Sequence, residues 1–580
     1  MHINLHKALL LLAAIATSMA INASTDEIKE SYISPTRIVW MSDNSGEFIK
    51  GADNLLKLFC GQVAVADPVS TELRSTDNHT ASILLDFGKE IHGGIEISSA
   101  IRDSQKQVKI HLCFGESVTE ALSSVADGKN PYNATNEHSL RDFDAFMPWL
   151  GSVRFGNTGF RFVRIDLLDT DITYTLRHIR AIARERDIPY LGSFECSDKR
   201  LNEIWQTGAY TVKLNMQEYL WDGIKRDRLV WAGDMNPEVM VINTVFGANE
   251  VVNKSLDFSV DDTPLPGWMN GMCPYSLWWL INQWQVYLYQ GNKEYLEKNH
   301  EYIKGLVKQI SKYIKPDGTE ALYGGTRFLD WPTSENPEVI HSGLQGLTVL
   351  AMNAAAEIGK SLGDKELEEL AKGDLKRLRK VKVDGYGNSQ AISMKVLAGI
   401  SQDEKKDVQK LLDNGVEAFS TFFGYYMLEA IAKGGKYEEG MEMISKYWGA
   451  MLDLGATTFW EELVYTDALK AGRIDEIVPE GKFDIHAHTG KYCYIGLRHS
   501  LCHGWSAGPT IWLTRHVLGI YPTEPGCKTL VVEPHLGNLE YAKGTFPTPY
   551  GVVTVSHTKN KDGKVISKID SPKQITVILK

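Results

Sequence analysis

Three aspartates, two arginines and a tryptophan lie between Asp222 and Asp234, where apolar segments flank the densest group of chemically active side chains in the chain. Charges beside an apolar interior cost free energy unless they pair or take part in chemistry. Arg226 can hold a carboxylate or a substrate hydroxyl by charge-assisted hydrogen bonds, and Trp231 can form a wall. We therefore expect a functional site here. A salt-bridged structural turn is the alternative interpretation.

A second source of carboxylates lies far downstream, in the segment Gly455-Ala-Thr-Thr-Phe-Trp-Glu461. Two separate carboxyl-bearing segments with aromatic neighbours are what acid/base cleavage of a glycosidic bond requires. Glu462 follows directly, and adjacent residues on a helix point about 100° apart, so only one of the two is expected to face a shared cleft. We choose Glu461. An exposed helix N-terminus with favourable acids is the alternative.

Other aromatic and polar side chains are candidates for lining the cleft. Asp330 and Trp331 stand just before a predicted helix, and His503 begins the last predicted helix as a candidate hydrogen-bond donor. Capping or packing is the alternative role for a lone histidine. A further aromatic group, for which a place in the core is at least as well supported, comprises Trp268, Tyr275, Trp278 and Trp279.

The hydrophobic pattern of the chain changes from strand-like to helical and then back to strand-like, which predicts three regions after the first 23 residues. Short apolar runs between Gly, Asp and Asn over residues 24–192 predict an antiparallel β-sandwich. About twelve helical stretches over 193–518 predict hairpins closed into an (α/α)6 toroid of six inner and six outer helices. Strands joined by Pro, Gly and Asp-Gly turns over 519–580 predict a small second β-sandwich.

One predicted helix begins directly after the first carboxylate cluster. Asn236 can cap it and Pro237 can take its first position. Asp234 is then expected beside the positive end of the helix, which favours its ionised form.

Composition excludes some partners. The chain has 580 residues and a formal net charge of −11, with only short basic runs, so nucleic acid is not expected to bind. Residues 1–23 combine a short basic opening, about ten apolar residues and small residues near the end, which predicts a secretory signal peptide. That stretch is too short to span a membrane, and no later stretch is long and apolar enough. We expect an exported protein, periplasmic or secreted.

Neither disulfides nor metal sites stand out. The seven cysteines are widely spaced without a Cys-x-x-Cys pair, so we expect most to be buried and predict no disulfide. His486 and His488 supply two potential metal ligands without a third, and ordinary loop histidines are the favoured interpretation. We predict no metal or cofactor, although calcium in a β-domain stays open, as does the oligomeric state.

The motifs together resemble the α-L-rhamnosidases of glycoside hydrolase family 78. That family carries Asp-x-x-x-Arg-(Asp)-Glu-Arg-Leu-Gly-(Trp/Tyr)-x-Gly-Asp, which this chain matches at Asp222, Arg226, Arg228, Leu229, Trp231, Gly233 and Asp234. The family's Gly-Ala-Thr-Thr-x-Trp-Glu ends at Glu461, its Ser-Leu-x-His ends at His503, and its Gly-Asp-Trp loop is met in part by Asp330-Trp331. The resemblance covers nearly all of the chain after the predicted signal.

The resemblance implies inverting hydrolysis of a terminal α-L-rhamnoside in plant glycans or glycosides. Asp227 stands where the family has its general-acid Glu, and Glu461 would activate water across a gap of about 6.5–9.5 Å. Asp222 and Asp234 would hold sugar hydroxyls. Arg226 opposes protonation of the acid, so its side chain is expected to be committed to another partner.

Asp227 is one methylene shorter than the family's Glu, and a small displacement of a catalytic group can cost about 10²-fold in rate. Three interpretations follow. The site is rebuilt around Asp227, which we favour; Glu238 takes the role of acid; or cleavage of ordinary rhamnosides is weak. Rival functions are a same-fold enzyme for another terminal sugar or a uronide, including a lyase, and a non-catalytic carbohydrate-binding relative.

Overall fold

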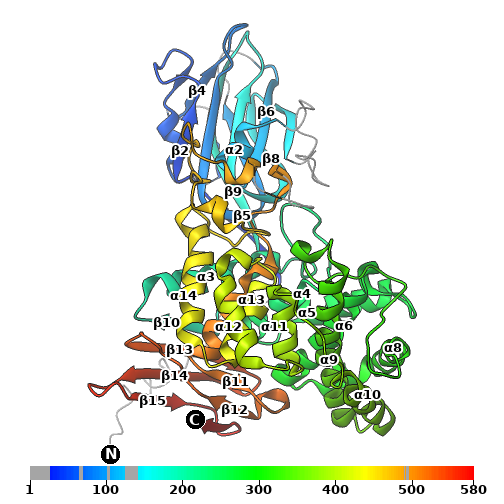
Figure 1. Cartoon of the computed structure of the whole chain (residues 1–580). Coiled ribbons are helices and arrows are strands. Elements are labelled where there is room, and N and C mark those ends of the chain that lie inside the picture. Colours follow the sequence, from blue (N-terminus) through cyan, green and yellow to red (C-terminus); the bar gives the residue numbers. More distant parts are fainter. Residues whose placement is uncertain are drawn as a thin grey trace, which may run out of the picture.

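The structure, a computed structural model, describes residues 26–59, 61–63, 69–100, 105–124, 141–488, 490 and 496–580. The predicted signal peptide at 1–23 lies outside the described residues. In the rest, a β-domain stands at one end of a helical body, and smaller sheets cover the body's opposite side (Figure 1). The predicted order of β, α and β regions is confirmed.

The N-terminal strands form one nine-stranded antiparallel sheet with the central order β3-β4-β9-β5-β8-β6-β7, while β1 pairs with β9 and β2 with β5. Alternating apolar side chains of its strands bury one common core. The strands are β1 (Ile28–Ile33), β2 (Arg37–Met41), β3 (Ile49–Lys50), β4 (Thr71–Arg74), β5 (Ser82–Ala100), β6 (Val108–Gly115), β7 (Asp142–Met147), β8 (Leu150–Leu167) and β9 (Thr173–Arg186).

A bulge in β5 lies between Gly93 and Ile95. Gly93 has a φ of +144°, and a Cβ there would lie 2.0 Å from the carbonyl oxygen of Ile182, so only glycine fits. The domain also carries a short helix that the sequence analysis did not predict, α2 (Val118–Leu122), which Ser117 caps through its side chain.

The helical body contains a closed series of contacts. Helices α4, α6, α9, α11, α13 and α17 each contact the next, and α17 contacts α4 again. The helices of the body are α3 (Lys199–Asn215), α4 (Met235–Val241), α5 (Glu250–Asp262), α6 (Cys273–Gln290), α7 (Lys293–Lys298), α8 (His300–Lys312), α9 (Pro337–Leu362), α10 (Lys365–Leu378), α11 (Ser389–Ala398), α12 (Glu404–Asn414), α13 (Gly424–Lys433), α14 (Tyr437–Asp453), α15 (Tyr465–Ala468), α16 (Ile485–His488) and α17 (Gly508–Trp512). Of these, α5 and α16 were not predicted from the sequence.

Two π-helical turns, η4 (Ile242–Phe246) and η10 (Leu513–Val517), extend α4 and α17. Short 3-10 turns include η6 (Trp331–Thr333), η7 (Val416–Ala418), η8 (Gly496–Arg498) and η9 (Gly504–Ala507). Helix α4 begins two residues before the predicted Pro237, so Asp234 takes the N-cap position expected for Asn236.

The C-terminal sheets pack on the helical body and share its hydrophobic core. One sheet has the order β10-β13-β14-β15, and the other β11-β12-β16, in which β12 and β16 are parallel. The strands are β10 (Ser193–Cys196), β11 (Ile520–Pro522), β12 (Thr529–Val532), β13 (Tyr541–Thr548), β14 (Gly551–Lys559), β15 (Val565–Asp570) and β16 (Thr576–Leu579). Strand β10 thus pairs with the C-terminal region, although it begins the region predicted to be helical.

The N-terminal domain meets the helical body beside the Gly455–Glu461 motif. Arg161 on β8 donates to the carbonyl oxygen of Gly455 at 2.9 Å, and the backbone N–H of Glu90 donates to the Thr457 hydroxyl at 2.9 Å. The segment after α15 runs up against this domain (Figure 1), where the N–H of Val118 donates to the Ile474 carbonyl at 2.8 Å.

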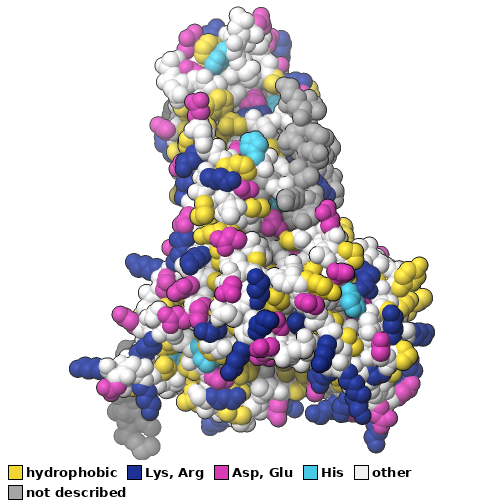
Figure 2. All heavy atoms as spheres, viewed as in Figure 1, with side chains coloured by type: hydrophobic (Ala, Val, Ile, Leu, Met, Phe, Trp, Pro, Cys, Tyr) yellow, Lys and Arg dark blue, Asp and Glu magenta, His cyan; other side chains and the backbone are white. Residues whose placement is uncertain are grey.

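Across the described ranges, no helix combines the length and apolar character needed to cross a membrane. Acidic and basic side chains are interspersed over the face in Figure 2. The described cysteines, Cys113, Cys196, Cys273, Cys502 and Cys527, are free and buried, as expected for most of the seven. Cys60 and Cys493 lie outside the described residues.

Candidate active site

The loop between α3 and α4 closes on itself through Asp222. The Asp222 N–H donates to the Leu229 carbonyl at 3.1 Å, and the Leu229 N–H donates to Asp222 Oδ1 at 2.9 Å. Asp227 and Arg228 at the tip have φ angles of 54° and 51°. Positive φ is uncommon for residues other than glycine and often marks functional loops. This tight turn directs Asp227 back toward its neighbour Arg226.

Arg226 joins the two carboxylates that the sequence analysis chose as catalytic. Its Nη1 donates to Asp227 Oδ2 at 2.9 Å, and its Nη2 donates to Glu461 Oε1. Arg226 thus has the expected partner other than Asp227, which is Glu461, but contrary to expectation it also binds Asp227. The planar guanidinium has donors in a fork and binds both carboxylates at once.

Glu461 lies in a non-helical segment between α14 and α15, so the alternative of a helix N-terminus does not apply. Its N–H donates to the Ser500 carbonyl at 2.9 Å, and the Ser500 N–H donates to Glu461 Oε2 at 3.1 Å. Trp505 Nε1 donates to its carbonyl oxygen at 2.9 Å. Burial raises the pKa of the Glu461 carboxyl, but Arg226 and the nearby histidines outweigh burial and bring it below its usual value. Glu461 is held rigidly and ionised.

His503 lies among three carboxylates. Its Nε2 is 3.6 Å from Asp222 Oδ2, 3.9 Å from Asp234 Oδ2 and 3.9 Å from Glu461 Oε1. Burial opposes the charged imidazolium, yet these three carboxylates raise the pKa of His503 overall. The predicted donor residue therefore sits at the centre of the site.

Asp234 does not have the ionisation expected from its place beside α4. Burial, together with Asp222 and Glu461, raises its pKa to about 7, because these effects outweigh the lowering by His503 and by the hydrogen bond from Tyr275. Tyr275 Oη donates to Asp234 Oδ1 at 2.6 Å. A Cβ at Gly233 would lie 2.4 Å from the Tyr275 ring, so the motif glycine admits this tyrosine.

A row of aromatic rings connects Asp234 to the loop of Asp330. Trp231 packs edge-on against Tyr275 at 6.0 Å between centroids, Tyr275 against Phe328 at 6.3 Å, and Phe328 against Trp331 at 5.2 Å. Trp231 and Trp331 are half-buried at the two ends. In contrast, Trp268, Trp278 and Trp279 are buried in the core, as their alternative interpretation proposed.

Asp330 is bound within the protein by three hydrogen-bond donors. Its side chain accepts hydrogen bonds from Ser420 Oγ at 2.6 Å, Gln390 Nε2 at 3.1 Å and the Trp331 N–H at 2.9 Å. Burial raises its pKa to about 6. This aspartate holds three segments together and fixes Trp331, and its predicted contact with substrate stays a prediction.

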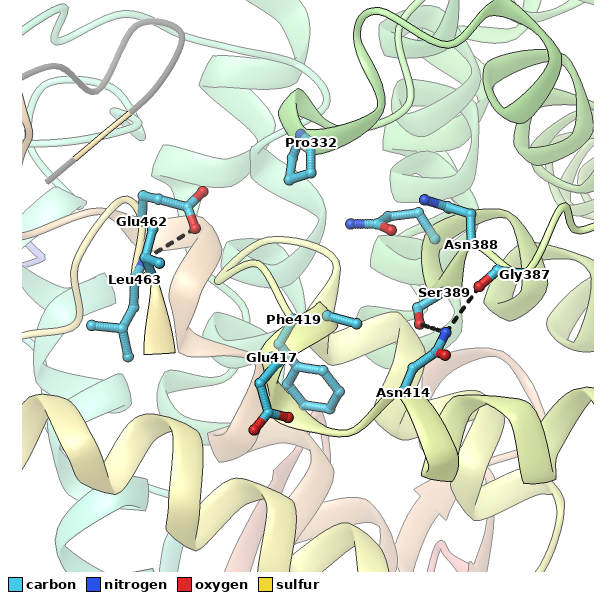
Figure 3. A pocket seen from close by; sticks show the side chains of 12 residues that line it. Pro332, Gly387, Asn388, Ser389, Asn414, Glu417, Phe419, Glu462 and Leu463 are labelled. Carbon is cyan, nitrogen blue, oxygen red and sulfur yellow. Dashed lines mark hydrogen bonds between the residues drawn. The ribbon is translucent and has the colours of Figure 1, made fainter. Parts of the chain in front are cut away.

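Glu462 faces a different space from Glu461. Burial and Asp330 raise the pKa of Glu462 to about 8. The residue lines a cavity of about 390 Å³ together with Pro332, Asn388 and Phe419 (Figure 3). That cavity is not lined by Asp227 or Glu461.

Glu238, the alternative acid, is fully buried on α4. Asn215 Nδ2 donates to its Oε1 at 3.4 Å, and a Cβ at Gly504 would lie only 1.6 Å from that oxygen. Burial raises its pKa well above the usual value. Asp227, in contrast, keeps 20% of its side chain exposed.

Two supporting residues were missed or left undecided by the sequence. Asn270 accepts from the Ala232 N–H at 3.0 Å and donates to the Val230 carbonyl at 3.0 Å, which fixes the backbone around Trp231. In the sequence, the glycine that follows Asn270 is a local signal of a turn, and in the structure Asn270 has a φ of 54°. Tyr275 was named in an aromatic group without its role at Asp234.

His486 is buried in α16 and belongs to a group with Glu116 and Glu120 whose ligand atoms lie within 4.8 Å of one another. Lys225 Nζ lies 2.9 Å from Glu120 and 3.3 Å from Glu116. The positive charge at this place therefore comes from the protein's own ammonium group.

Residues 189–517 match the bacterial alpha-L-rhamnosidase six-hairpin glycosidase domain, and residues 519–580 match the bacterial alpha-L-rhamnosidase C-terminal domain. An alpha-L-rhamnosidase of Alteromonas sp. (strain LOR) is 24% identical over 535 residues, which cover 84% of this chain and 54% of that protein. One of Formosa agariphila is 22% identical over 526 residues, covering 80% and 53%. The chain thus spans about half the length of the curated relatives it matches.

Solved structures share the fold. A family 78 rhamnosidase of Bacillus sp. GL1 aligns with a TM-score of 0.68 at 21% identity, covering 91% of this chain and 55% of that one. A rhamnosidase of Klebsiella oxytoca with rhamnose bound aligns with a TM-score of 0.63 at 19% identity, covering 84% and 96%.

Proposed function

Because this chain belongs to the bacterial α-L-rhamnosidase family, glycoside hydrolase family 78, we propose that it is an inverting glycoside hydrolase. The family that the motifs indicated is confirmed. Its proposed reaction is release of terminal α-L-rhamnose from plant glycans or glycosides. Residues 1–23 are proposed to direct export to the periplasm or the medium.

The observation that carries this proposal is the shared guanidinium between Asp227 and Glu461. Two hydrogen bonds and the width of one guanidinium limit the separation of the bonded oxygens to about 7 Å or less. Inverting enzymes separate their two carboxyls by about 6.5–9.5 Å, which leaves room for the attacking water. The shared guanidinium therefore supports joint action of the two carboxyls, and inversion is part of the proposal.

In the proposed reaction, protonated Asp227 gives its proton to the glycosidic oxygen as the bond from that oxygen to the anomeric carbon breaks. Glu461 takes a proton from water, whose oxygen bonds to the anomeric carbon from the opposite face. The products are free rhamnose and the alcohol that carried it. Proton exchange with solvent then returns both carboxyls to their starting states.

Arg226 must change partners during this cycle. Its Nη1 donates to Asp227 Oδ2, whereas in the proposed reaction the Asp227 carboxyl must donate a proton to the substrate. We propose that a sugar hydroxyl replaces Asp227 at Nη1 when substrate binds, while Nη2 stays on Glu461. His503, Asp222 and Asp234 then hold the remaining hydroxyls, with Trp231 and Trp331 as apolar walls.

Asp227 is favoured over Glu238 as the acid because it has exposed surface and Glu238 has none. The closed contact series of α4, α6, α9, α11, α13 and α17 supports an (α/α)6 toroid, with these six as the inner helices. The loops between helices at the end facing the N-terminal domain would then carry the site.

The test is release of rhamnose from an aryl α-L-rhamnoside and from rhamnose-containing plant glycans. We expect Asp227→Asn and Glu461→Gln each to lower kcat by ~10³-fold or more, since general acid or base catalysis contributes about 10²–10⁴-fold. Glu462→Gln, a matched neighbour outside the carboxylate group, is expected to keep most activity.

The same assay separates the rivals. An unsaturated product that absorbs in the ultraviolet would indicate a lyase. Sugar binding without any product at high enzyme concentration would indicate a binding protein. Full activity in Asp227→Asn would refute the role of Asp227.

A further inference from the structure

Lys225, the residue before Arg226, has no exposed surface. Its Nζ lies 2.9 Å from Glu120 Oε1 and 3.3 Å from Glu116 Oε2, both in the N-terminal β-domain. The same ammonium donates to the carbonyl oxygens of Leu497 at 2.6 Å and His499 at 2.8 Å. It therefore joins three segments that are far apart in the sequence: the loop of Asp227, helix α2 with its preceding turn, and the 497–499 stretch.

The 497–503 stretch is also the support of Glu461. Ser500 exchanges two hydrogen bonds with Glu461, at 2.9 and 3.1 Å, and the Glu462 N–H donates to His499 Nε2 at 2.9 Å. Glu116 binds this stretch directly, because its Oε2 accepts from the Leu501 N–H at 2.6 Å. Lys225 and Glu116 thus bind the two segments that carry the catalytic carboxylates.

The charges around Lys225 are balanced inside the protein. Arg141 Nη2 donates to Glu120 Oε1 at 2.6 Å. Burial opposes ionisation of Glu120, but Arg141 and Lys225 lower its pKa to about 2, whereas burial raises the pKa of Glu116 to about 7. Buried ion pairs add little net stability, although removing one partner is costly, and in some proteins they specify a single geometry.

We propose that Lys225 is a positioning residue that fixes Asp227 relative to Glu461 by tying both of their segments to α2 of the N-terminal β-domain. This inference rests on the proposed function, in which those two carboxyls act together. The β-domain then contributes to catalysis, because it sets the distance between the Asp227 and Glu461 carboxyls and so the width of the gap in which water must fit. Lys225 itself touches no reacting atom.

The experiment compares three variants of the full chain. Lys225→Met removes the ammonium and leaves two buried glutamates without it, so we expect lower Tm as well as lower activity. Lys225→Met combined with Glu116→Gln and Glu120→Gln removes the unpaired charge. Lys395→Met is the matched control, because Lys395 is also buried but pairs with Asp407, which joins α11 to α12.

In the combined variant we expect Tm to return most of the way to the wild-type value. We expect kcat to stay ~10²-fold low with KM changed much less, since misplacing a catalytic group costs about that factor. Lys395→Met is expected to change Tm without this loss of kcat. Recovery of both Tm and kcat in the combined variant would overturn the proposal, because it would show a purely structural role.

Hydrogen exchange separates failure of this inference from failure of the proposed function. We expect faster amide exchange over both 222–230 and 497–503 in the combined variant, with no such joint change in Lys395→Met. If the wild-type protein releases no rhamnose, the proposed function fails, and the exchange data alone decide whether Lys225 ties the two segments. Unchanged amide exchange in either segment would refute the proposal that Lys225 connects the two segments.

Discussion

At the scale of residues, the site combines four carboxyls with two cationic side chains. His503 lies between Asp222, Asp234 and Glu461, and Arg226 lies between Glu461 and Asp227. Burial gives these groups different protonation: the pKa of Asp234 is raised to about 7, while that of Glu461 is lowered. Different environments thus give the carboxyls of one site different protonation states, which suits Glu461 to act as a base and Asp234 to hydrogen-bond a sugar hydroxyl.

Replacing Arg226 tests the ionisation of Glu461. Arg226 lowers the pKa of Glu461, and the base must be ionised, so kcat/KM falls as pH drops through that pKa. Arg226→Gln removes the lowering influence, and we expect the acidic limb of the kcat/KM profile to move to higher pH. The pH–rate profile measures this directly.

Arg228→Gln is the matched control, since Arg228 leaves the same loop but donates to the Asn157 carbonyl at 2.9 Å. Its acidic limb is expected to stay in place. An unshifted limb in Arg226→Gln would contradict the assignment of Glu461 as the base held by Arg226.

At the scale of elements, the site depends on how the 222–234 loop enters α4 and packs on α6. Gly233 lets the Tyr275 ring of α6 approach the backbone, and Tyr275 then holds Asp234 at the start of α4. Asn270 fixes the loop from the other side. Gly233 therefore determines whether Tyr275 can contact both the aromatic row and the Asp234 carboxylate.

We expect Gly233→Ala to lower the stability of the protein by about 1–3 kcal/mol, the usual cost of overpacking, and to weaken sugar binding. Thermal unfolding and KM measure the two effects. Gly373→Ala in α10 is the matched control: its Cβ meets nothing within 4 Å, so higher helix propensity should raise stability by up to about 1 kcal/mol. Equal effects at the two positions would argue against the close contact with Tyr275.

At the scale of the whole molecule, the three regions do not share one core. The N-terminal sheet has its own core, whereas the C-terminal sheets pack into the core of the helical body. Strand β10 precedes the helices and pairs with β13, which joins the start of the body to the C-terminal region.

A chain that ends at residue 518 should therefore fail to fold as a stable helical domain. Removal of residues 519–580 would expose apolar side chains of the helical body that pack against them, including Tyr289, whose ring centroid lies 6.0 Å from that of Phe546, and would leave β10 without its partner. Soluble yield and calorimetry measure this. A truncated protein that unfolds cooperatively near the wild-type Tm would contradict the shared core.

The sequence predicted what local patterns encode. The order of β, α and β regions follows from periodicity, and the motifs around Asp222, Glu461 and His503 indicated residues that the fold brings together. Local patterns did not indicate that β10 pairs with a strand more than three hundred residues away, that Arg226 binds both carboxylates, or that Lys225 is buried against α2. Each of these depends on long-range packing. The raised pKa of Asp234 likewise comes from burial, which no neighbouring residue in the sequence reveals.

The central claim is that Asp227 and Glu461 act from opposite faces of a rhamnose ring. The most direct measurement is proton NMR of the first sugar released from an α-L-rhamnoside, taken before mutarotation. The account predicts that the β-anomer of rhamnose appears first. Early appearance of the α-anomer, or no free rhamnose at any enzyme concentration, would contradict it.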